Sequence, residues 1–517
     1  MAILPKDAPD GASWAAAAVT LLFALNPSHV EAVVWIAGRK DVLSGMFSLL
    51  ALWLALRARR PHGGFSAPWA TATLVALLAA IYSKATAISV AAIVSLLWLM
   101  FWYAAGGMKG SRRALLWPLS SLLLAICAAM TFAAITTQRI PFHFGGETIT
   151  RALAILGWLA RLSFSPEGRH FYYPLFEYSW LPAMAALGAV VFVAALWGGV
   201  AVFRNRPLEG FALLAFMLLC LPSLQLVPYR PPSPVSDRFI FLAVWPAMLL
   251  LVSVCWRLRP LLRMLILLAI ALSWLPEDIK RPRDWQSFER VAKVDEQAYP
   301  DSLLPTAYTI MLIQLPGGLH EEAMERASRI TSPEIRDAMT ALVRAERAVH
   351  LAPASDAMKE LTDWGQTLRQ PFPGRAWDTS LAFVLDKLTG ALVEDWRVLA
   401  GRFPADAGIH YSAGMYLLSL NTQYREAAAY FRVALASPEL PPVVRSTAHK
   451  NLGIALLGNK QFAEAETALR AALGQSPQDQ EAHCVLAVVY AREGEASDAT
   501  REQAACPDRS FRVEMPK

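Results

Sequence analysis

The sequence predicts an all-α protein, in which a polytopic transmembrane helical domain of about nine helices precedes an α-solenoid of helical repeats. Up to about Pro276, apolar runs follow one another with few charges, whereas the rest of the chain is densely charged and has no long apolar run. Towards the C-terminus, small and large apolar residues recur at intervals of about 34 residues. We therefore expect a membrane domain at 1–276, a helical linker with degenerate repeats at 277–400, and a repeat domain at 401–517.

Nine apolar runs have lengths near the roughly 20 residues that a membrane-spanning helix needs. The first is short, because Asn26-Pro27 must end or bend it. No small-residue cleavage site follows it, so we expect it to act as an uncleaved anchor. The nine expected spans are about 13–26, 42–57, 67–83, 86–104, 115–137, 181–203, 210–227, 238–256 and 261–276.

Basic residues gather in every second short loop, which predicts that these loops are cytoplasmic. They are Arg57, Arg59 and Arg60; Lys109, Arg112 and Arg113; Arg204 and Arg206; and Arg257, Arg259 and Arg263. The N-terminus is then cytoplasmic, and the repeats lie outside the cytoplasm, as in a bacterial inner-membrane protein with a periplasmic domain. The net charge of +6 follows mostly from this bias. No basic patch with interleaved aromatics appears in the soluble half, so we expect no nucleic-acid partner.

The repeat pattern is clearest in the segment that begins at Asn451. Gly453, Ala465, Leu469 and Ala472 occupy positions where two helices of a tetratricopeptide unit approach closely, and Pro477 ends the unit. Equivalent residues recur about one repeat earlier and later: Gly414, Ala427, Phe431 and Ala434; Leu486, Ala487, Tyr490 and Ala499. Such arrays present concave surfaces to peptides or partner proteins, although a structural spacer is the alternative.

The stretch between these repeats and the membrane domain is also helical by pattern. Helices are expected at about 321–328, 332–350 and 355–368, where the repeat signature is weak. Cys484 and Cys506 lie on consecutive helices of the last repeat and can form a disulfide in an oxidising compartment. No cysteine spacing suggests a metal site.

Ionisable residues at the extracytoplasmic membrane boundary are the candidate functional residues, because charges there are costly to dehydrate. His29, Glu31, Arg39 and Asp41 lie between the first two apolar runs, and Lys84 lies between the third and fourth. A long loop, 138–180, carries many aromatics and the amphipathic segment 151–164, and the segment 229–238 ends in Asp237-Arg238. Each feature also has a structural interpretation, as a snorkelling cation, a helix cap or an interfacial belt. Together, Arg39, Lys84 and Arg238 could hold a phosphate or diphosphate of a lipid-linked substrate.

The segment Asn26-Pro-Ser-His-Val-Glu-Ala-Val-Val-Trp-Ile-Ala-Gly-Arg-Lys-Asp41 resembles a motif of the transmembrane and tetratricopeptide-repeat O-mannosyltransferase-like family. The family motif reads His-Pro-x-His-x-Glu-x-Val-x-Trp-Ile-x-Gly-Arg-x-Asp. Lys84 resembles the family's Lys-Glu motif, Asp237-Arg238-Phe239-Ile240-Phe241 its Glu-Arg-Tyr-Leu-Tyr motif, and Asp284-Trp285 its Arg-Asp-Trp. The resemblance covers nearly the whole chain in the same order.

The resemblance implies a glycosyltransferase of the GT-C type. Such an enzyme transfers a sugar from a polyprenyl-phosphate donor to a protein or glycan acceptor on the extracytoplasmic side. It implies that four residues bind the substrate: His29, Arg39, Lys84 and Arg238. It also implies that membrane lipids surround the protein. It specifies no cofactor, and a divalent metal stays open.

The motifs depart from the family at two places, because Asn26 replaces a His and Ala85 replaces a Glu. The family also has two helices upstream, joined by an acidic loop, and this chain starts after that loop. Transfer needs a carboxylate that takes the acceptor proton. Glu31, Asp41 and Asp237 are the candidate catalytic residues, and further carboxylates on the same side are Glu147, Glu167 and Glu177. None lies in a recognisable base motif, so we expect weak or no transferase activity from this chain alone.

Two other functions fit the same residues. The chain could be a non-catalytic membrane anchor that displays a tetratricopeptide scaffold for assembly of an envelope or surface structure. It could also be a lipid-linked glycan ligase, which would use residues of the long loop, namely Arg139, His143, Arg169 and His170.

Overall fold

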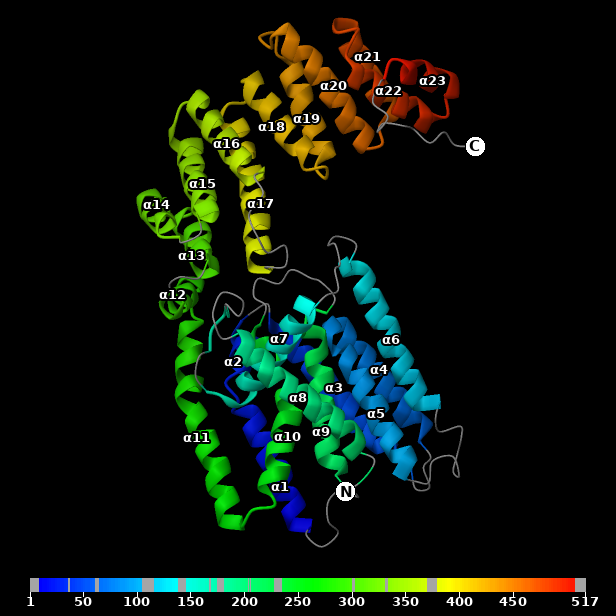
Figure 1. The fold of residues 1–517 in the computed structure, drawn as a ribbon, viewed down its shortest axis with the longest axis vertical. Coiled ribbons are helices and arrows are strands. Elements are labelled where there is room, and N and C mark those ends of the chain that lie inside the picture. The colour runs from blue at the N-terminus through cyan, green and yellow to red at the C-terminus, as the bar shows by residue number, and fades with distance from the viewer. Residues whose placement is uncertain are drawn as a thin grey trace. The chain divides into compact units, whose positions relative to one another are not determined.

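Helices make up the regular secondary structure throughout the described part of the chain, which confirms the all-α class. A single β-bridge, between Arg59 and Phe65, is the exception there. The computed structural model describes residues 9–35, 38–60, 65–104, 116–137, 146–166, 169–173, 181–202, 204, 206–226, 235–299, 303–330, 333–369 and 379–506. The chain divides into two compact units (Figure 1). Unit 1 is Met1–Thr309 with Ala376–Phe383, and unit 2 is Ile310–Arg375 with Val384–Lys517.

Each of the nine apolar runs expected in the first part of the chain forms a helix in unit 1. The helices of unit 1 are α1 (Pro9–Ala24), α2 (His29–Val34), α3 (Arg39–Ala58), α4 (Ala67–Ser83), α5 (Ile88–Ala104), α6 (Leu116–Thr137), α7 (Gly146–Phe164), α8 (Leu181–Ala201), α9 (Pro207–Cys220), α10 (Val244–Cys255), α11 (Pro260–Asp284), α12 (Phe288–Ala298) and α13 (Leu303–Thr309). Within the described residues, four segments are long and apolar enough to cross a membrane: Arg39–Ala58, Ala85–Ala104, Leu181–Ala201 and Pro260–Asp284. Unit 1 is therefore the membrane-associated part of the protein.

The amphipathic segment expected at 151–164 forms most of α7, and its apolar face packs on α8. Gly157 and Gly188 allow this approach, since a Cβ at Gly157 would lie 2.0 Å from the carbonyl oxygen of Met184. A Cβ at Gly188 would lie 1.8 Å from the carbonyl oxygen of Leu153. Helix α7 is thus covered by protein along this face, and it supports the loop that follows it.

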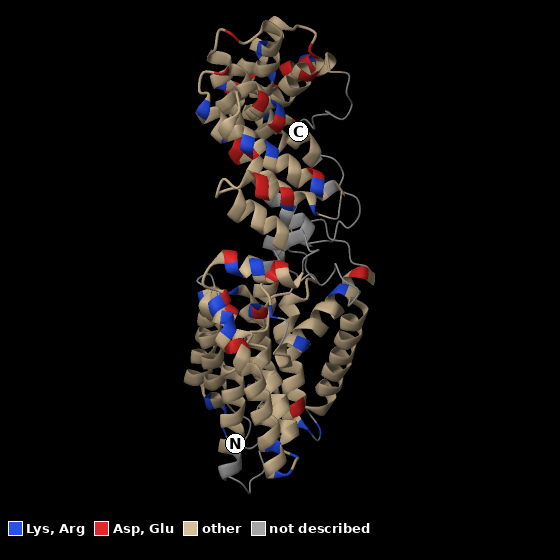
Figure 2. Ribbon diagram, turned by 90° about the vertical axis from the view of Figure 1, so that its left-hand side faces the viewer, with Lys and Arg blue, Asp and Glu red and all other residues tan. Residues whose placement is uncertain are grey.

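Charged residues of unit 1 gather towards the two ends of the helical bundle, with a nearly uncharged middle (Figure 2). Arg57 in the last turn of α3, Arg206 before α9 and Arg257 after α10 lie at the end where α1 begins. Asp41 in the first turn of α3 and Lys84 after α4 lie at the opposite end. The bundle therefore separates the basic connections from the candidate site residues.

Unit 2 consists of helical hairpins. Its helices are α14 (His320–Ser328), α15 (Pro333–Leu351), α16 (Ala354–Arg369), α17 (Thr379–Arg402, which begins in unit 1), α18 (Ala407–Ser419), α19 (Tyr424–Ala436), α20 (Pro442–Gly458), α21 (Phe462–Gln475), α22 (Gln480–Glu493) and α23 (Ala496–Ala504). Helices α14, α15 and α16 confirm the three helices expected at 321–328, 332–350 and 355–368. The π-helical turn Ile310–Gln314 was not expected from the sequence.

Glycines let the paired helices of unit 2 approach closely. A Cβ at Gly414 of α18 would lie 2.9 Å from the ring of Phe431 on α19. A Cβ at Gly453 of α20 would lie 2.5 Å from Cγ of Leu469 on α21. The small residues of the sequence pattern therefore mark real helix–helix contacts.

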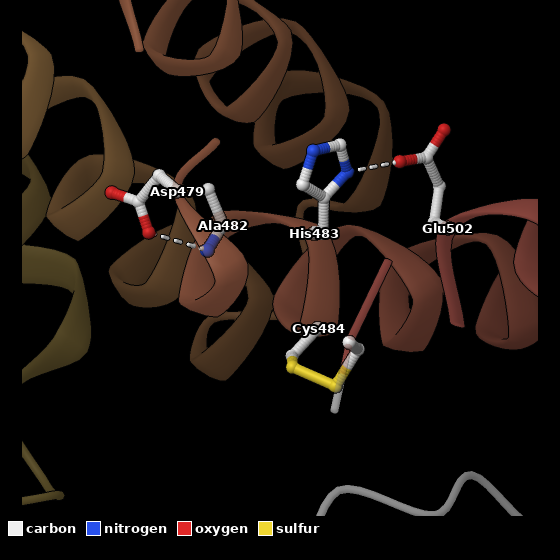
Figure 3. The surroundings of a disulfide bond; sticks show 6 residues. Asp479, Ala482, His483, Cys484 and Glu502 are labelled. Atoms are coloured by element: carbon white, nitrogen blue, oxygen red, sulfur yellow. Dashed lines mark hydrogen bonds and ion pairs between the residues drawn. A yellow bond between two sulfur atoms is a disulfide. The ribbon is translucent and has the colours of Figure 1, made fainter. Parts of the chain in front are cut away.

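A disulfide joins Cys484 in α22 to Cys506, which follows α23, and this pairing closes the last hairpin (Figure 3). Their Cα atoms are 4.9 Å apart. Beside it, His483 Nδ1 lies 2.6 Å from a carboxylate oxygen of Glu502. Asp479 caps α22 by accepting a hydrogen bond of 3.1 Å from the backbone N–H of Ala482. The pairing that the sequence left open is therefore present in the structure.

Candidate functional site

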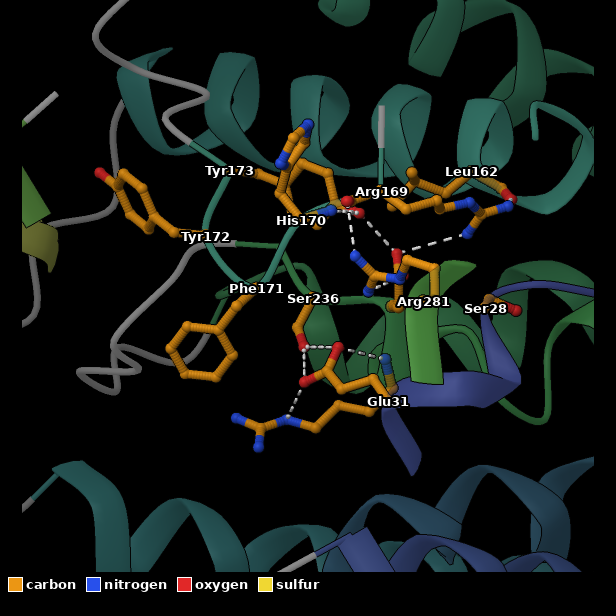
Figure 4. A network of polar contacts seen from close by, with 12 residues as sticks. Ser28, Glu31, Leu162, Arg169, His170, Phe171, Tyr172, Tyr173, Ser236 and Arg281 are labelled. Carbon is orange, nitrogen blue, oxygen red and sulfur yellow. Dashed lines mark hydrogen bonds and ion pairs between the residues drawn. The ribbon is translucent and has the colours of Figure 1, made fainter. Parts of the chain in front are cut away.

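A buried polar network at the α2 end of unit 1 includes Glu31, Arg169 and Arg281 (Figure 4). Asp237 is its most connected carboxylate. It begins the short 3-10 helix Asp237–Phe239. Its Oδ1 accepts a hydrogen bond of 2.6 Å from the hydroxyl of Tyr173 and lies 3.3 Å from a guanidinium nitrogen of Arg169. Its Oδ2 accepts a bond of 3.0 Å from Arg281 of α11. Two cations and a hydroxyl thus enclose this carboxylate, and it joins three segments that are distant in sequence.

Asp295 of α12 holds the segment 169–173 from its other side. Its two carboxylate oxygens accept hydrogen bonds from the backbone N–H groups of Phe171, at 3.2 Å, and Tyr172, at 2.9 Å. The imidazole Nδ1 of His170 lies 3.4 Å from the same carboxylate. The loop after α7 is therefore fixed by Asp295 and Asp237 together.

Glu31 of α2 orients Arg238. The Glu31 side chain is fully buried, and its two oxygens accept hydrogen bonds of 2.7 and 2.8 Å from the hydroxyl of Ser236. It also accepts a bond of 3.2 Å from the backbone N–H of Arg238, whose Nε lies 3.6 Å away. The Arg238 guanidinium lies 4.5 Å from the ring centre of Trp35. Burial raises the pKa of Glu31 to about 7, while the charge of Arg238 opposes this shift.

Asp41 of α3 forms an ion pair with Lys84, which ends α4. The Lys84 side chain is 18% exposed and that of Asp41 is 2% exposed. Burial lowers the pKa of Lys84, while Asp41 opposes this shift. Among the described residues, Asp41 Oδ2 has no hydrogen-bond partner. Within the described residues, this oxygen is therefore a buried acceptor without a donor.

Lys84, Arg238 and Asp41 line one small pocket of about 40 Å³. The hydroxyl-bearing residues Ser44, Thr86 and Ser223 line it as well. Glu31 does not line the pocket but pairs with its cation Arg238, whereas the Asp237 side chain pairs with Arg169 and Arg281. The lining carries two cations and one carboxylate, so the pocket favours an anion.

The sequence assigned four residues to substrate binding. Two of them, Lys84 and Arg238, line this pocket. Arg39 is exposed and does not line it. The His29 ring packs between Phe23 and Phe241, with ring centres 4.5 and 4.8 Å away. Burial lowers the pKa of His29 to about 4, so its imidazole is neutral near pH 7 and supplies no charge to a phosphate.

The sequence did not assign Tyr173, Ser236, Arg281 or Asp295 to the site. Arg169 was assigned only to the ligase alternative, and it is buried against Asp237. Of these residues, Arg281 could have been found from the sequence. It follows an apolar run, and an arginine there needs a charged partner if the fold buries it. Glu147 is exposed at the start of α7. Four other sequence candidates lie outside the described residues: Arg139, His143, Glu167 and Glu177.

In the described ranges, no three His, Cys, Asp or Glu side chains come together as metal ligands would. The divalent metal that the resemblance left open therefore gains no ligand set from these residues.

No protein-family model matches the chain, and no curated protein is significantly similar to it in sequence. The site is therefore interpreted from its own geometry.

Proposed function

We propose that this protein is an integral-membrane, glycosyltransferase-like protein of the GT-C type. Enzymes of this type transfer a sugar from a polyprenyl-phosphate donor to a protein or glycan acceptor on the extracytoplasmic side, and this chain is either such an enzyme or a truncated or inactive form of one. The observation that carries the proposal is that Lys84 and Arg238, from distant parts of the chain, line one pocket. Two of the lining residues, Asp41 and Lys84, belong to the start of α3 and the end of α4, and these helix ends lie opposite the basic connections. Under the positive-inside rule, that end is extracytoplasmic.

A phosphate suits this pocket because both cations are partly exposed and each is paired with a buried carboxylate. The side chains of Lys84 and Arg238 are 18% and 14% exposed. In the transfer, a bond forms from the acceptor oxygen to the anomeric carbon, and the bond from that carbon to the phosphate oxygen breaks. The cations stabilise the charge that develops on the departing lipid phosphate.

Asp41 is the carboxylate placed best to take the acceptor proton, because it lines the pocket and one of its oxygens has no partner in the described chain. Glu31 and Asp237 are fully enclosed by their own partners. Asp41 already forms an ion pair with Lys84, so the acceptor hydroxyl would have to compete with Lys84 for this carboxylate. We therefore expect weak or no transferase activity from the purified chain, and turnover of a polyprenyl-phosphate sugar would contradict this.

The alternative function is a non-catalytic membrane anchor with a tetratricopeptide scaffold. One observation favours it: Glu31, Asp41 and Asp237 each face a cation of the chain itself, so the cluster can be purely structural. Three consecutive hairpins, from α18 to α23, fit a tetratricopeptide array for a protein partner.

Binding of a lipid phosphate separates the two functions. We expect Lys84→Gln and Arg238→Gln to weaken the binding of undecaprenyl phosphate at least about tenfold, measured by native mass spectrometry of the purified chain. Arg60→Ala removes an exposed arginine from the opposite end and is the control for charge. Asp41→Asn breaks the same ion pair as Lys84→Gln but keeps the cation, so it should bind the lipid at least as well as the original chain. Equal binding by all variants would favour the scaffold.

A further inference from the structure

A second pocket lies wholly within unit 2 and has no part in the membrane site. Its volume is about 680 Å³, within the range of pockets that hold ligands. Three segments line it: the connection between α17 and α18 with the first turns of α18, the loop 439–441 with the start of α20, and Met358 of α16.

Side chain to backbone contacts fix both loops of this pocket. His410 Nε2 lies 3.0 Å from the carbonyl oxygen of Pro404, and Asp406 caps α18 by accepting bonds of 2.9 and 3.0 Å from backbone N–H groups. Across the pocket, Arg445 donates to three carbonyl oxygens at 2.8 to 3.2 Å, among them that of Leu440. Since these loops are held before any ligand arrives, little ordering entropy opposes binding.

The interior of the pocket is apolar and its edge is polar. Phe403, Tyr411, Leu440 and Val444 supply ring and aliphatic surface, which suits an apolar side chain. Pro404, Glu439 and Pro441 are exposed residues of the lining, so the pocket opens to the surface. An open side next to an apolar interior fits an extended chain that places one side chain inside and continues across the edge.

The lining of the pocket has a net negative charge, because it holds two carboxylates, Asp406 and Glu439, and one cation, Arg402. The guanidinium of Arg402 donates 2.8 Å to the carbonyl oxygen of Val349 and lies 4.9 Å from the ring centre of Phe403. The Asp406 carboxylate serves as the cap of α18. In the described part of the chain, the exposed carboxylate of Glu439 has no ion-pair partner. A cation of the ligand therefore meets Glu439.

We propose that this pocket binds an extended peptide segment of a partner protein, which carries an apolar residue and, two positions further on, a basic residue. In an extended chain, residues two positions apart point to the same side, so the apolar side chain enters the pocket while the basic one reaches Glu439. The inference deepens the partner binding proposed for unit 2, and it does not depend on the chemistry of the membrane pocket.

The test measures fluorescence anisotropy of short labelled peptides with the full chain in nanodiscs of neutral lipid. The probes share Gly-Ser flanks and differ at the centre: Leu-Ser-Lys, Leu-Ser-Glu, Leu-Ser-Ser and Ser-Ser-Lys. The Leu-Ser-Lys probe should bind best. Glu439→Lys should weaken its binding about threefold to tenfold and should reverse the preference towards Leu-Ser-Glu. Glu322→Lys changes an exposed glutamate of α14 in the same way and should leave every affinity unchanged.

Ser412→Trp fills the pocket and should abolish binding of all probes, with helical content checked by circular dichroism. Equal affinity of Leu-Ser-Lys and Leu-Ser-Ser would overturn the proposal and indicate a site for an uncharged apolar compound. Unchanged preference in Glu439→Lys, or binding that survives Ser412→Trp in a folded protein, would also overturn it. Lipid-phosphate binding is measured separately on the same preparation. A failure of the peptide-binding proposal is therefore distinguishable from a failure of the proposed function.

Discussion

At the scale of single residues, the site of unit 1 is organised by carboxylates that hold cations in place. A buried carboxylate is stable only when charges or donors surround it. Asp237 meets two arginines and a tyrosine, and Glu31 meets Ser236 and Arg238. Both are therefore positioning residues, and the residues that meet a ligand are the partly exposed Lys84 and Arg238.

Glu31 makes the affinity for a phosphodiester depend on pH. Burial raises its pKa to about 7, so Glu31 loses its charge as the pH falls through that value and then competes less for Arg238. Binding of a polyprenyl-phosphate hexose, which does not itself titrate there, should strengthen several-fold from about pH 8 to about pH 6. Glu31→Gln should bind tightly at both pH values, as measured by native mass spectrometry.

The control is Glu147→Gln, which removes an exposed carboxylate of α7 and should keep the original pH profile. A slope that persists in Glu31→Gln would assign the titration to another group.

Asp395 makes the stability of unit 2 depend on pH. Burial, Glu346 and Glu394 raise the pKa of Asp395 to about 8. The folded state therefore keeps a proton that the unfolded chain gives up near pH 4, so stability is greatest below about pH 4, falls as the pH rises from about 4 to about 8, and is level above that. The slope is at most about 1.4 kcal/mol per pH unit. Asp395→Asn should remove this pH dependence and should stabilise α15 to α17 at about pH 8. Hydrogen exchange in the intact protein measures both effects.

Glu394→Gln is the matched control, because Glu394 is a neighbouring but exposed carboxylate. It should shift stability much less than Asp395→Asn does. Equal protection of α15 to α17 in Asp395→Asn and the original chain at alkaline pH would contradict the assignment.

The sequence identified several site residues but not their partners. Asp41 and Lys84 could be selected because charged residues between apolar runs are rare. Their pairing could not be deduced, since 43 residues separate them and only the packing of α3 against α4 brings them together. Arg169 and Asp237 are 68 residues apart and meet through the fold in the same way.

At the scale of helices, the nine apolar runs of unit 1 each predicted a helix but not where that helix ends. The last run was expected to stop at 276, at a proline. Helix α11 instead continues to Asp284 through Pro276 and Pro282. Its last turns are held because Arg281 bonds to Asp237 and to the carbonyl oxygen of Arg169. A tertiary contact thus overrides the local stop signal.

The close approach of α20 and α21 predicts a large effect of one methyl group. Gly453→Ala would place Cβ 2.5 Å from Cγ of Leu469, so the two helices must separate. We expect a loss of about 1–3 kcal/mol in the stability of this hairpin, measured by hydrogen exchange. Gly474→Ala, in α21, meets no atom within 4 Å and should be neutral or stabilising by up to about 1 kcal/mol. Equal effects of the two changes would show that this contact does not limit the packing.

At the scale of the whole molecule, two features bear on orientation in the membrane. The basic connections and the polar site lie at opposite ends of unit 1, and unit 2 contains a disulfide. Disulfides persist in oxidising compartments, and basic loops stay in the cytoplasm. Both favour the orientation that a lipid-linked sugar donor outside the cytoplasm requires.

This orientation predicts which positions a membrane-impermeant maleimide can reach in intact bacterial cells. Arg60 follows α3, at the end of unit 1 where α1 begins, and Glu322 is an exposed residue of unit 2. Glu322→Cys should be labelled in intact cells, whereas Arg60→Cys should be labelled only after the membrane is opened. Exposed Cys127 is replaced by Ser in both variants, so that it does not contribute to the signal. Labelling of Arg60→Cys in intact cells would place the pocket of Lys84 and Arg238 on the cytoplasmic side and would rule out an extracytoplasmic donor.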